Sequence, residues 1–271
     1  MSTSFRIGPF WPGWTGIKKL VIFGDSYSYV GYHSQASPPT AAKPLGLNHP
    51  GTPVTEPGQA NWVGHLITSY NHGRSNILVY DYAVRGDTVL GVTAQISNQF
   101  LPTVGRRPQW AAWRPEDTLF ITWIGVNDCR TMITVTMDGI VAAIANLFAA
   151  QEQLYRAGAR NFLFVDVPPV DRSPAGANAA GDYSLRFKVW NEQLRKAMHD
   201  FTAAHADATV LLFSSWNTFT RVLDNPAAYG LNPHDVRTQG GSIWFDYMHP
   251  SSRFLKIIAY DIANLLIQSG Q

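Results

Sequence analysis

The stretch Val21-Ile22-Phe23-Gly24-Asp25-Ser26-Tyr27-Ser28 joins an apolar run to a short polar segment. The apolar run is typical of a buried parallel strand, and Ser26 follows it directly, where a strand would turn into a helix. A serine there is exposed at the carboxyl edge of a sheet, and the start of the next helix would offer backbone N–H groups to a developing negative charge. An ordinary helix N-cap serine suits the position equally well, so the stretch alone leaves both interpretations open.

Further apolar runs and helical patterns alternate along the chain. The runs Lys19–Gly24, Ile77–Tyr82, Thr118–Gly125, Asn161–Val167 and Thr209–Ser214 predict five buried strands. Helical periodicity covers Ala60–Tyr70, Val89–Phe100, Met137–Ala157, Tyr183–Ala206 and Arg253–Gln268. This alternation predicts a three-layer α/β/α sandwich around a five-stranded parallel sheet, and we expect one domain over residues 1–271.

Composition excludes several classes of function. The net charge of +2 comes from well-mixed charges without a basic run, so nucleic acid is not an expected partner. No apolar stretch approaches the roughly 18 residues that span a bilayer. His199 and His205 are six residues apart on a predicted helix, which places them on different faces, so we expect no metal site and no cofactor.

Three absences favour an intracellular protein. Cys129 is the only cysteine, the N-terminus lacks the apolar core of a secretory signal, and no Asn-x-Ser/Thr acceptor site occurs. A secreted protein whose leader has been removed is the alternative. The sequence does not indicate the oligomeric state.

A histidine with a nearby carboxylate lies close to the far end of the chain, in Asp246-Tyr247-Met248-His249. A serine hydroxyl is a weak nucleophile until a base takes its proton, and that base works best when a third group orients it. Asp246 can reach Nδ1–H of His249 and leave Nε2 facing Ser26, while Pro250 disfavours helical geometry at the histidine. We therefore predict a Ser26–His249–Asp246 triad; a purely structural His249 is the alternative.

Two further strand exits can supply an oxyanion hole. Gly86 follows the second predicted strand, where it lets the backbone approach a reacting carbonyl. Asn127 follows the third, and its amide can donate a second hydrogen bond beside the N–H of Ser26 itself. Gly and Asn also favour ordinary turns, so each signal is weak alone and gains weight from their joint placement.

Ser26, Gly86, Asn127 and His249 match the four-block pattern of the SGNH (GDSL) hydrolase superfamily, which the chain resembles along nearly its whole length. The supporting stretches are Phe23-Gly24-Asp25-Ser26-Tyr27, Asn61-Trp62-Val63, Trp123-Ile124-Gly125-Val126-Asn127-Asp128 and Phe245-Asp246-Tyr247-Met248-His249-Pro250. Within the superfamily it looks most like fungal carbohydrate esterases that act as acetyl esterases. The resemblance implies a flavodoxin-like fold and ester hydrolysis.

Arg85 departs from the small residue that relatives commonly carry before the glycine of the second block. One interpretation is an ion pair with Asp87 that stiffens the turn; the other is a contact with an acidic or polyhydroxylated substrate at the rim of the site. The long Pro-rich segments Gly31–Gln59 and Pro168–Gly181 leave the carboxyl ends of strands, where they can border the ligand crevice.

The predicted function is hydrolysis of short-chain, acetyl-type carboxylic esters, with an acetylated oligosaccharide as one candidate substrate. A lipase or lysophospholipase on the same scaffold is the first alternative. It would need an apolar trough, and the segment Gly31–Gln59 carries few large aliphatic residues apart from Leu45, Leu47 and Val54. A catalytically silent carbohydrate-binding protein is the second alternative.

Overall fold

The fold is built around one six-stranded sheet. The computed structural model describes residues 1–71, 73, 77–131, 137–177 and 183–270. Strands β2 (Lys19–Gly24), β3 (Leu78–Asp81), β4 (Thr118–Trp123), β5 (Asn161–Val165) and β6 (Thr209–Phe213) are parallel, in the order β6-β5-β4-β2-β3. Each is a continuous apolar run because helices cover both faces of the sheet. The predicted α/β sandwich is thereby confirmed.

The predicted strand count is wrong by one, because β1 (Thr3–Arg6) adds an antiparallel edge strand beside β6. This segment is short, and its four residues are exposed or only partly buried. It therefore lacks the buried apolar run by which the five parallel strands were recognised. Phe5 alone packs against the core from this strand.

The strand order places a topological switch between β2 and β4. The chain goes from β2 to β3 on one side, and then returns past β2 to build β4, β5 and β6 on the other. Ligands of doubly wound folds bind outside the carboxyl ends of the strands at such a switch. Ser26 follows β2 and Asn127 follows β4, so these two residues border the switch directly.

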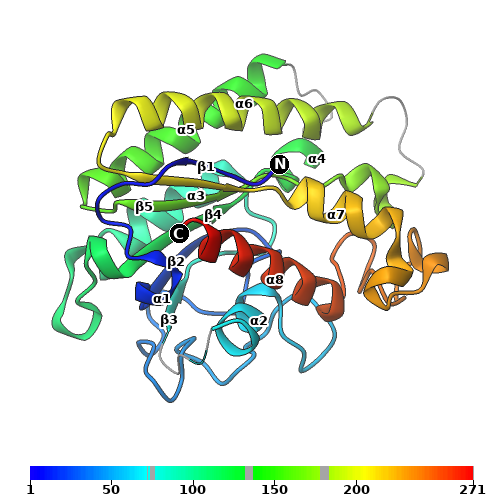
Figure 1. Cartoon of the computed structure of the whole chain (residues 1–271), viewed down its shortest axis with the longest axis horizontal. Helices are drawn as coiled ribbons and strands as arrows, with labels where there is room; N and C mark the ends of the chain where they lie inside the picture. The colour runs from blue at the N-terminus through cyan, green and yellow to red at the C-terminus, as the bar shows by residue number, and fades with distance from the viewer. Residues whose placement is uncertain (72, 74–76, 132–136, 178–182, 271) are drawn as a thin grey trace.

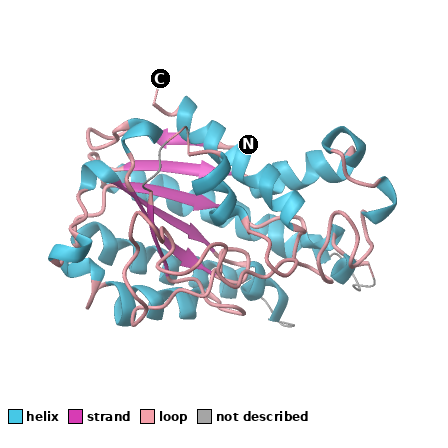
Figure 2. Cartoon of the chain, turned by 90° about the horizontal axis from the view of Figure 1, so that it is seen from below, coloured by secondary structure: helices cyan, strands magenta, loops and turns pink. Residues whose placement is uncertain are grey.

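Two helical layers enclose the sheet (Figures 1 and 2). One layer holds α2 (Trp62–Ser69) and α8 (Ser252–Gln268) side by side, with α1 (Gly13–Gly16) and α7 (Ser215–Asp224) against α8. The other holds α5 (Met137–Arg156) packed on α6 (Tyr183–Ala204), with α3 (Val89–Ala94) and α4 (Val126–Thr131). Within the described residues, no helix is both long and apolar enough to cross a membrane.

Two helical features differ from the expected pattern. The predicted helix Val89–Phe100 is α-helical only as far as Ala94 and continues as a π-helix over Gln95–Phe100. The helix α7 was not predicted; Ser214 caps it by accepting a hydrogen bond from Asn217 N–H at 3.3 Å. Isolated turns of π-helix often occur at functional sites.

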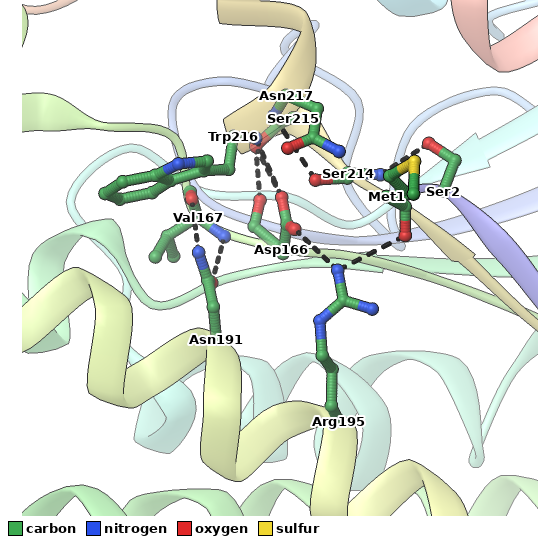
Figure 3. A network of polar contacts seen from close by, with 10 residues as sticks. All are labelled: Met1, Ser2, Asp166, Val167, Asn191, Arg195, Ser214, Ser215, Trp216 and Asn217. Carbon is green, nitrogen blue, oxygen red and sulfur yellow. Dashed lines mark hydrogen bonds and ion pairs between the residues drawn. The ribbon is translucent and has the colours of Figure 1, made fainter. Parts of the chain in front are cut away.

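A polar network anchors α6 and α7 to the carboxyl edge of the sheet (Figure 3). Asp166, directly after β5, accepts hydrogen bonds from Trp216 N–H at 2.9 Å and from the Ser215 hydroxyl. Asn191 of α6 binds both the N–H and the carbonyl of Val167, at 2.8 and 2.9 Å. Burial raises the pKa of Asp166, and the hydrogen bonds from Trp216 and Ser215, together with Arg195 at 3.6 Å, partly oppose that rise.

The segment Gly31–Gln59 packs against the body of the molecule. Leu45 within it is fully buried. The carbonyl of Pro44 accepts a hydrogen bond from Val79 N–H at 2.8 Å, on the outer edge of β3. Near its end, the Glu56 carboxylate accepts from Ser252 N–H at the start of α8, also at 2.8 Å.

Candidate active site

Ser26 lies in a single turn between β2 and the segment that follows. Both Ser28 N–H and Tyr29 N–H donate to the carbonyl of Asp25 at 3.1 Å, but no helix develops from this turn. The expected helix is absent because the Asn61 amide donates to the carbonyls of Ser28 and Tyr29, at 3.0 and 3.1 Å. These carbonyls are the acceptors that the next helical turn would use.

His249 connects the hydroxyl of Ser26 with the carboxylate of Asp246. Its Nε2 lies 2.7 Å from Ser26 Oγ, and its Nδ1 lies 2.7 Å from Asp246 Oδ2. The structure thus brings together these three residues, which are 223 and 3 positions apart in the chain. Ser26 is 6% exposed and His249 9%, so the pair is shielded but still reachable from solvent.

Asp246 is held by its own loop. Its Oδ1 accepts hydrogen bonds from the N–H groups of Met248 and His249, at 2.8 and 2.7 Å. Burial alone would raise the pKa of Asp246, but the hydrogen bonds from the imidazole and from these N–H groups outweigh burial and lower that pKa. The carboxylate is therefore ionised, which suits a group that orients an imidazole.

Tyr27 is a neighbouring residue that the sequence did not single out. Its buried phenol donates to the carbonyl of Met248 at 2.9 Å, and its ring lies 5.7 Å from the His249 ring, centroid to centroid. Behind the same loop, Ala175 N–H donates to the carbonyl of Tyr247 at 2.8 Å. Tyr27 thus connects the turn that holds Ser26 with the loop that holds His249.

Two of the predicted oxyanion-hole donors are backbone N–H groups, those of Ser26 and Gly86. Within the described part of the chain, neither Ser26 N–H nor Gly86 N–H donates a hydrogen bond to the protein. Gly86 has φ +81°, a conformation that favours glycine, and a side chain there would point into open space. The absence of such hydrogen bonds in the described residues is compatible with their predicted role as oxyanion donors.

The Asn127 amide stands beside them in α4. Its Nδ2 donates to the carbonyl of Asp87 at 2.9 Å and lies 3.5 Å from Asp25 Oδ2. The first hydrogen bond has an ordinary length and orients the amide, whereas the second is at the limit of hydrogen bonding.

Buried carboxyl groups surround this amide. Burial, and then the nearby charges of Asp128 and Asp87, raise the pKa of Asp25 to about 7, although the N–H of Tyr27 opposes the shift. Burial likewise raises the pKa of Asp128 to about 6, against the hydrogen bond from Val89 N–H. At neutral pH, therefore, the negative charge next to Asn127 is smaller than the residue types suggest.

Gln95, in the first turn of the π-helix, connects two of the site segments and was also missed by sequence reasoning. Its Oε1 accepts from Gly24 N–H at 3.0 Å, and its Nε2 donates to the Gly24 carbonyl at 2.8 Å and to Asp87 Oδ2 at 2.7 Å. The side chain is 1% exposed. It therefore ties the end of β2 to the turn that carries Gly86.

Arg85 does not pair with Asp87, so the predicted ion pair is wrong. Its Nη2 donates to the Thr52 carbonyl at 2.6 Å, and its guanidinium lies over the Tyr29 ring at 4.6 Å. The Asp87 carboxylate instead accepts from Gln95. Arg85 and Phe245, neighbours of Gly86 and Asp246, line a pocket of about 350 Å³ together with residues 51–58.

Comparison with known proteins identifies the family. The family model of the GDSL-like lipases and acylhydrolases matches residues 20–262, which include every site segment described above. The chain belongs to this family. It is a carboxylic ester hydrolase with the family's α/β fold, and the alternative of a catalytically silent binding protein is not supported.

Relatives of this GDSL hydrolase include two fungal acetylesterases. That of Thermothelomyces thermophilus is 32% identical over 91% of this chain and 87% of its own length, and that of Hypocrea jecorina is 21% identical over 92% and 88%. Among solved structures, a variant of an acetyl xylan esterase from Geobacillus stearothermophilus has a TM-score of 0.61 at 15% identity, covering 92% of this chain and 94% of that one. A lipolytic GDSL protein from Veillonella parvula has a TM-score of 0.54 at 16% identity, over 91% and 96%. At these identities the structural matches support the fold alone.

Proposed function

We propose that this GDSL hydrolase cleaves short-chain, acetyl-type esters through an acyl-enzyme formed on Ser26. The observation that carries the proposal is the position of His249, whose two ring nitrogens each lie 2.7 Å from an oxygen, one of Ser26 and one of Asp246. This geometry suits an imidazole that takes the serine proton while a carboxylate fixes its tautomer.

The first step joins Ser26 Oγ to the carbonyl carbon of the ester as Nε2 of His249 removes the hydroxyl proton. The N–H groups of Ser26 and Gly86 and the Asn127 amide stabilise the negative oxygen that forms. The imidazolium then returns the proton to the departing alcohol. Water, activated by the same imidazole, attacks the acyl-enzyme in the second step and releases the acid.

The acetyl preference rests on the two acetylesterases that are 32% and 21% identical to the chain over the aligned residues. The pocket beside Arg85 is consistent with a polar alcohol group. Thr52, Thr55 and Arg85 lie among its lining residues, together with prolines and Phe245. An acetylated sugar would present hydroxyl groups to such a surface.

A test of the nucleophile uses Ser26→Ala with Ser97→Ala, an exchange outside the site, as the matched control. We expect Ser26→Ala to lose both turnover of 4-nitrophenyl acetate and covalent capture by an organophosphonate, read as a mass increase of the intact chain. The control should keep both. Labelling that persists in Ser26→Ala would assign the nucleophile to another residue.

A test of the acyl preference compares 4-nitrophenyl acetate with the octanoate and palmitate. We expect kcat/KM to fall as the acyl chain lengthens, and acetylated xylo-oligosaccharides to be cleaved in preference to phospholipids. A kcat/KM that rises towards palmitate would favour the lipase alternative.

A further inference from the structure

A pocket of about 290 Å³ lies at the start of α8, between this helix, the end of α2 and the segment after α7. None of the proposed catalytic residues lines it. Tyr70 and Tyr260 form an aromatic corner within it, with ring centroids 5.5 Å apart and planes inclined by 60°. Tyr260 is 50% exposed, so one wall of the corner is open to a ligand.

Two cations in this pocket lack a carboxylate partner. Arg253 and Lys256 are exposed on α8, and within the ranges that the structure describes neither takes part in an ion pair. The third cation of the pocket, Arg221, is already bound to Asp261, the acidic residue of the lining. The pocket thus carries an excess of positive charge.

Other charges also lie near the start of α8. Arg253 is the second residue of α8, whose first turn holds no acidic residue, but the Glu56 carboxylate accepts a hydrogen bond from Ser252 N–H at 2.8 Å. This carboxylate offsets the partial positive charge of the helix N-terminus, which would otherwise repel Arg253. Burial and then the nearby charge of Lys256 lower the pKa of His65.

The pocket at the carboxyl edge of the sheet provides a contrast. That pocket, of about 310 Å³, holds two cations, Lys188 and Arg195, and Asp166 lies 3.6 Å from Arg195 (Figure 3). Asp166, Asn191 and Arg195 of its lining take part in the network that anchors α6 and α7, which indicates a structural role. At α8, by contrast, aromatic faces and unpaired cations remain available.

We propose that the pocket at α8 binds a sugar acid, with the sugar ring against Tyr70 and Tyr260 and the carboxylate on Arg253 and Lys256. Guanidinium and ammonium groups bind a carboxylate by charge-assisted hydrogen bonds. The aromatic corner fits the non-planar face of a sugar ring better than a flat ligand, which would need parallel walls. This proposal does not depend on the catalytic roles given above.

The tyrosine hydroxyls add donors for sugar oxygens. Burial, and then the neighbouring Tyr260 and Asp261, raise the pKa of Tyr70, so its phenol stays protonated at neutral pH. A neutral phenol can donate to a sugar hydroxyl as well as accept from it. A bound uronate unit would anchor an acidic oligosaccharide on the same molecule that carries the esterase site.

The test is a titration of the ¹⁵N-labelled full chain with D-glucuronate and with D-glucose, followed by NMR. Glucuronate should shift resonances of residues around the pocket, and glucose should shift them little. The double variant Arg253→Gln/Lys256→Gln should weaken glucuronate binding about ten-fold or more. Tyr260→Ala should also weaken it, and Tyr260→Phe should largely restore the ring contact.

The matched control is Lys188→Gln/Arg237→Gln, which removes the same charge elsewhere and should bind glucuronate like the wild type. Thermal unfolding checks that all variants fold. Three results would overturn the proposal: equal shifts with glucose, equal competition by acetate or benzoate, or an equal loss of affinity in the control.

Discussion

The side-chain amide of Gln95 forms two hydrogen bonds with the main chain of Gly24, one to its N–H at 3.0 Å and one to its carbonyl at 2.8 Å. In this way a side chain from a π-helix pairs with main-chain groups at the end of β2, as a neighbouring strand would. The turn that holds Ser26 follows directly. The third hydrogen bond of Gln95 is donated to the carboxylate of Asp87, the residue after Gly86. Gln95 therefore also restricts the turn that holds Gly86. Residue 95 is therefore in a position to set the spacing between the nucleophile and the proposed oxyanion hole.

Replacing Gln95 by Met keeps the volume of the side chain but removes these hydrogen bonds. Buried groups left without partners cost about 1–3 kcal/mol each, so we expect the variant to unfold several degrees below the wild type. We also expect kcat for 4-nitrophenyl acetate to fall more than KM changes. Gln99→Met, in the same π-helix, is the control; equal kcat in both variants would remove Gln95 from this role.

Asn127→Ala tests the side-chain donor of the proposed oxyanion hole. Loss of one such donor typically costs about 3–4 kcal/mol of transition-state stabilisation, so turnover should fall roughly 100- to 1000-fold. The measurement is kcat on 4-nitrophenyl acetate, with circular dichroism as the check on folding. Asn98→Ala, on an exposed position, should behave like the wild type. Near-full turnover in Asn127→Ala would contradict the assignment.

Asp246→Asn tests the orienting carboxylate. The Asn side chain would present an N–H to Nδ1 of His249, which forces the proton onto Nε2 and leaves no lone pair for the serine proton. The equivalent change in a serine protease lowers kcat by about 10⁴-fold, and we expect a decrease of up to that size. Asp224→Asn, on the surface, is the control. If Asp246→Asn keeps turnover within about ten-fold, another group orients the imidazole.

Asp25 makes the stability of the protein depend on pH. Its pKa is about 7 in the folded chain against 3.8 for the free side chain, so the folded state holds a proton that the unfolded state has lost between these values. The stabilisation is complete below pH 3.8 and is lost as the pH rises through 7. Asp25→Asn lacks this titration, so the Tm advantage of the wild type over the variant should shrink between pH 4 and pH 7.

The control for this measurement is Asp200→Asn, an exchange on an exposed position of α6. Its Tm difference from the wild type should not follow the same pH dependence. A constant difference between wild type and Asp25→Asn across the range would mean that Asp25 is not protonated in the folded protein.

The sequence alone was sufficient to predict those features of the fold and the site that depend on a local pattern of residues. The five parallel strands are continuous apolar runs, and Ser26, Gly86 and Asn127 could be singled out because each follows such a run. The spacing of Asp246 and His249 likewise indicated a contact that the structure contains.

What the sequence did not reveal depends on partners far along the chain. Gln95 binds a residue 71 positions away, and Arg85 takes its partner from the segment 33 positions before it, not from the adjacent Asp87. The single turn at Ser26 ends because Asn61 binds its carbonyls, which no local propensity encodes. The edge strand β1 escaped notice because an exposed strand needs no buried apolar run.

The hydrogen bond between Pro44 and Val79 has a consequence for access to the site. The Pro-rich segment, whose residues 51–58 line the pocket beside Arg85, also pairs with the free edge of β3 through this hydrogen bond, so an outward movement of the segment at Pro44 would break that pairing. Opening it would uncover main-chain groups that pair readily with another chain. Substrate entry should therefore proceed through small side-chain movements at the rim, and an enzyme engineered with a loosened segment would risk self-association.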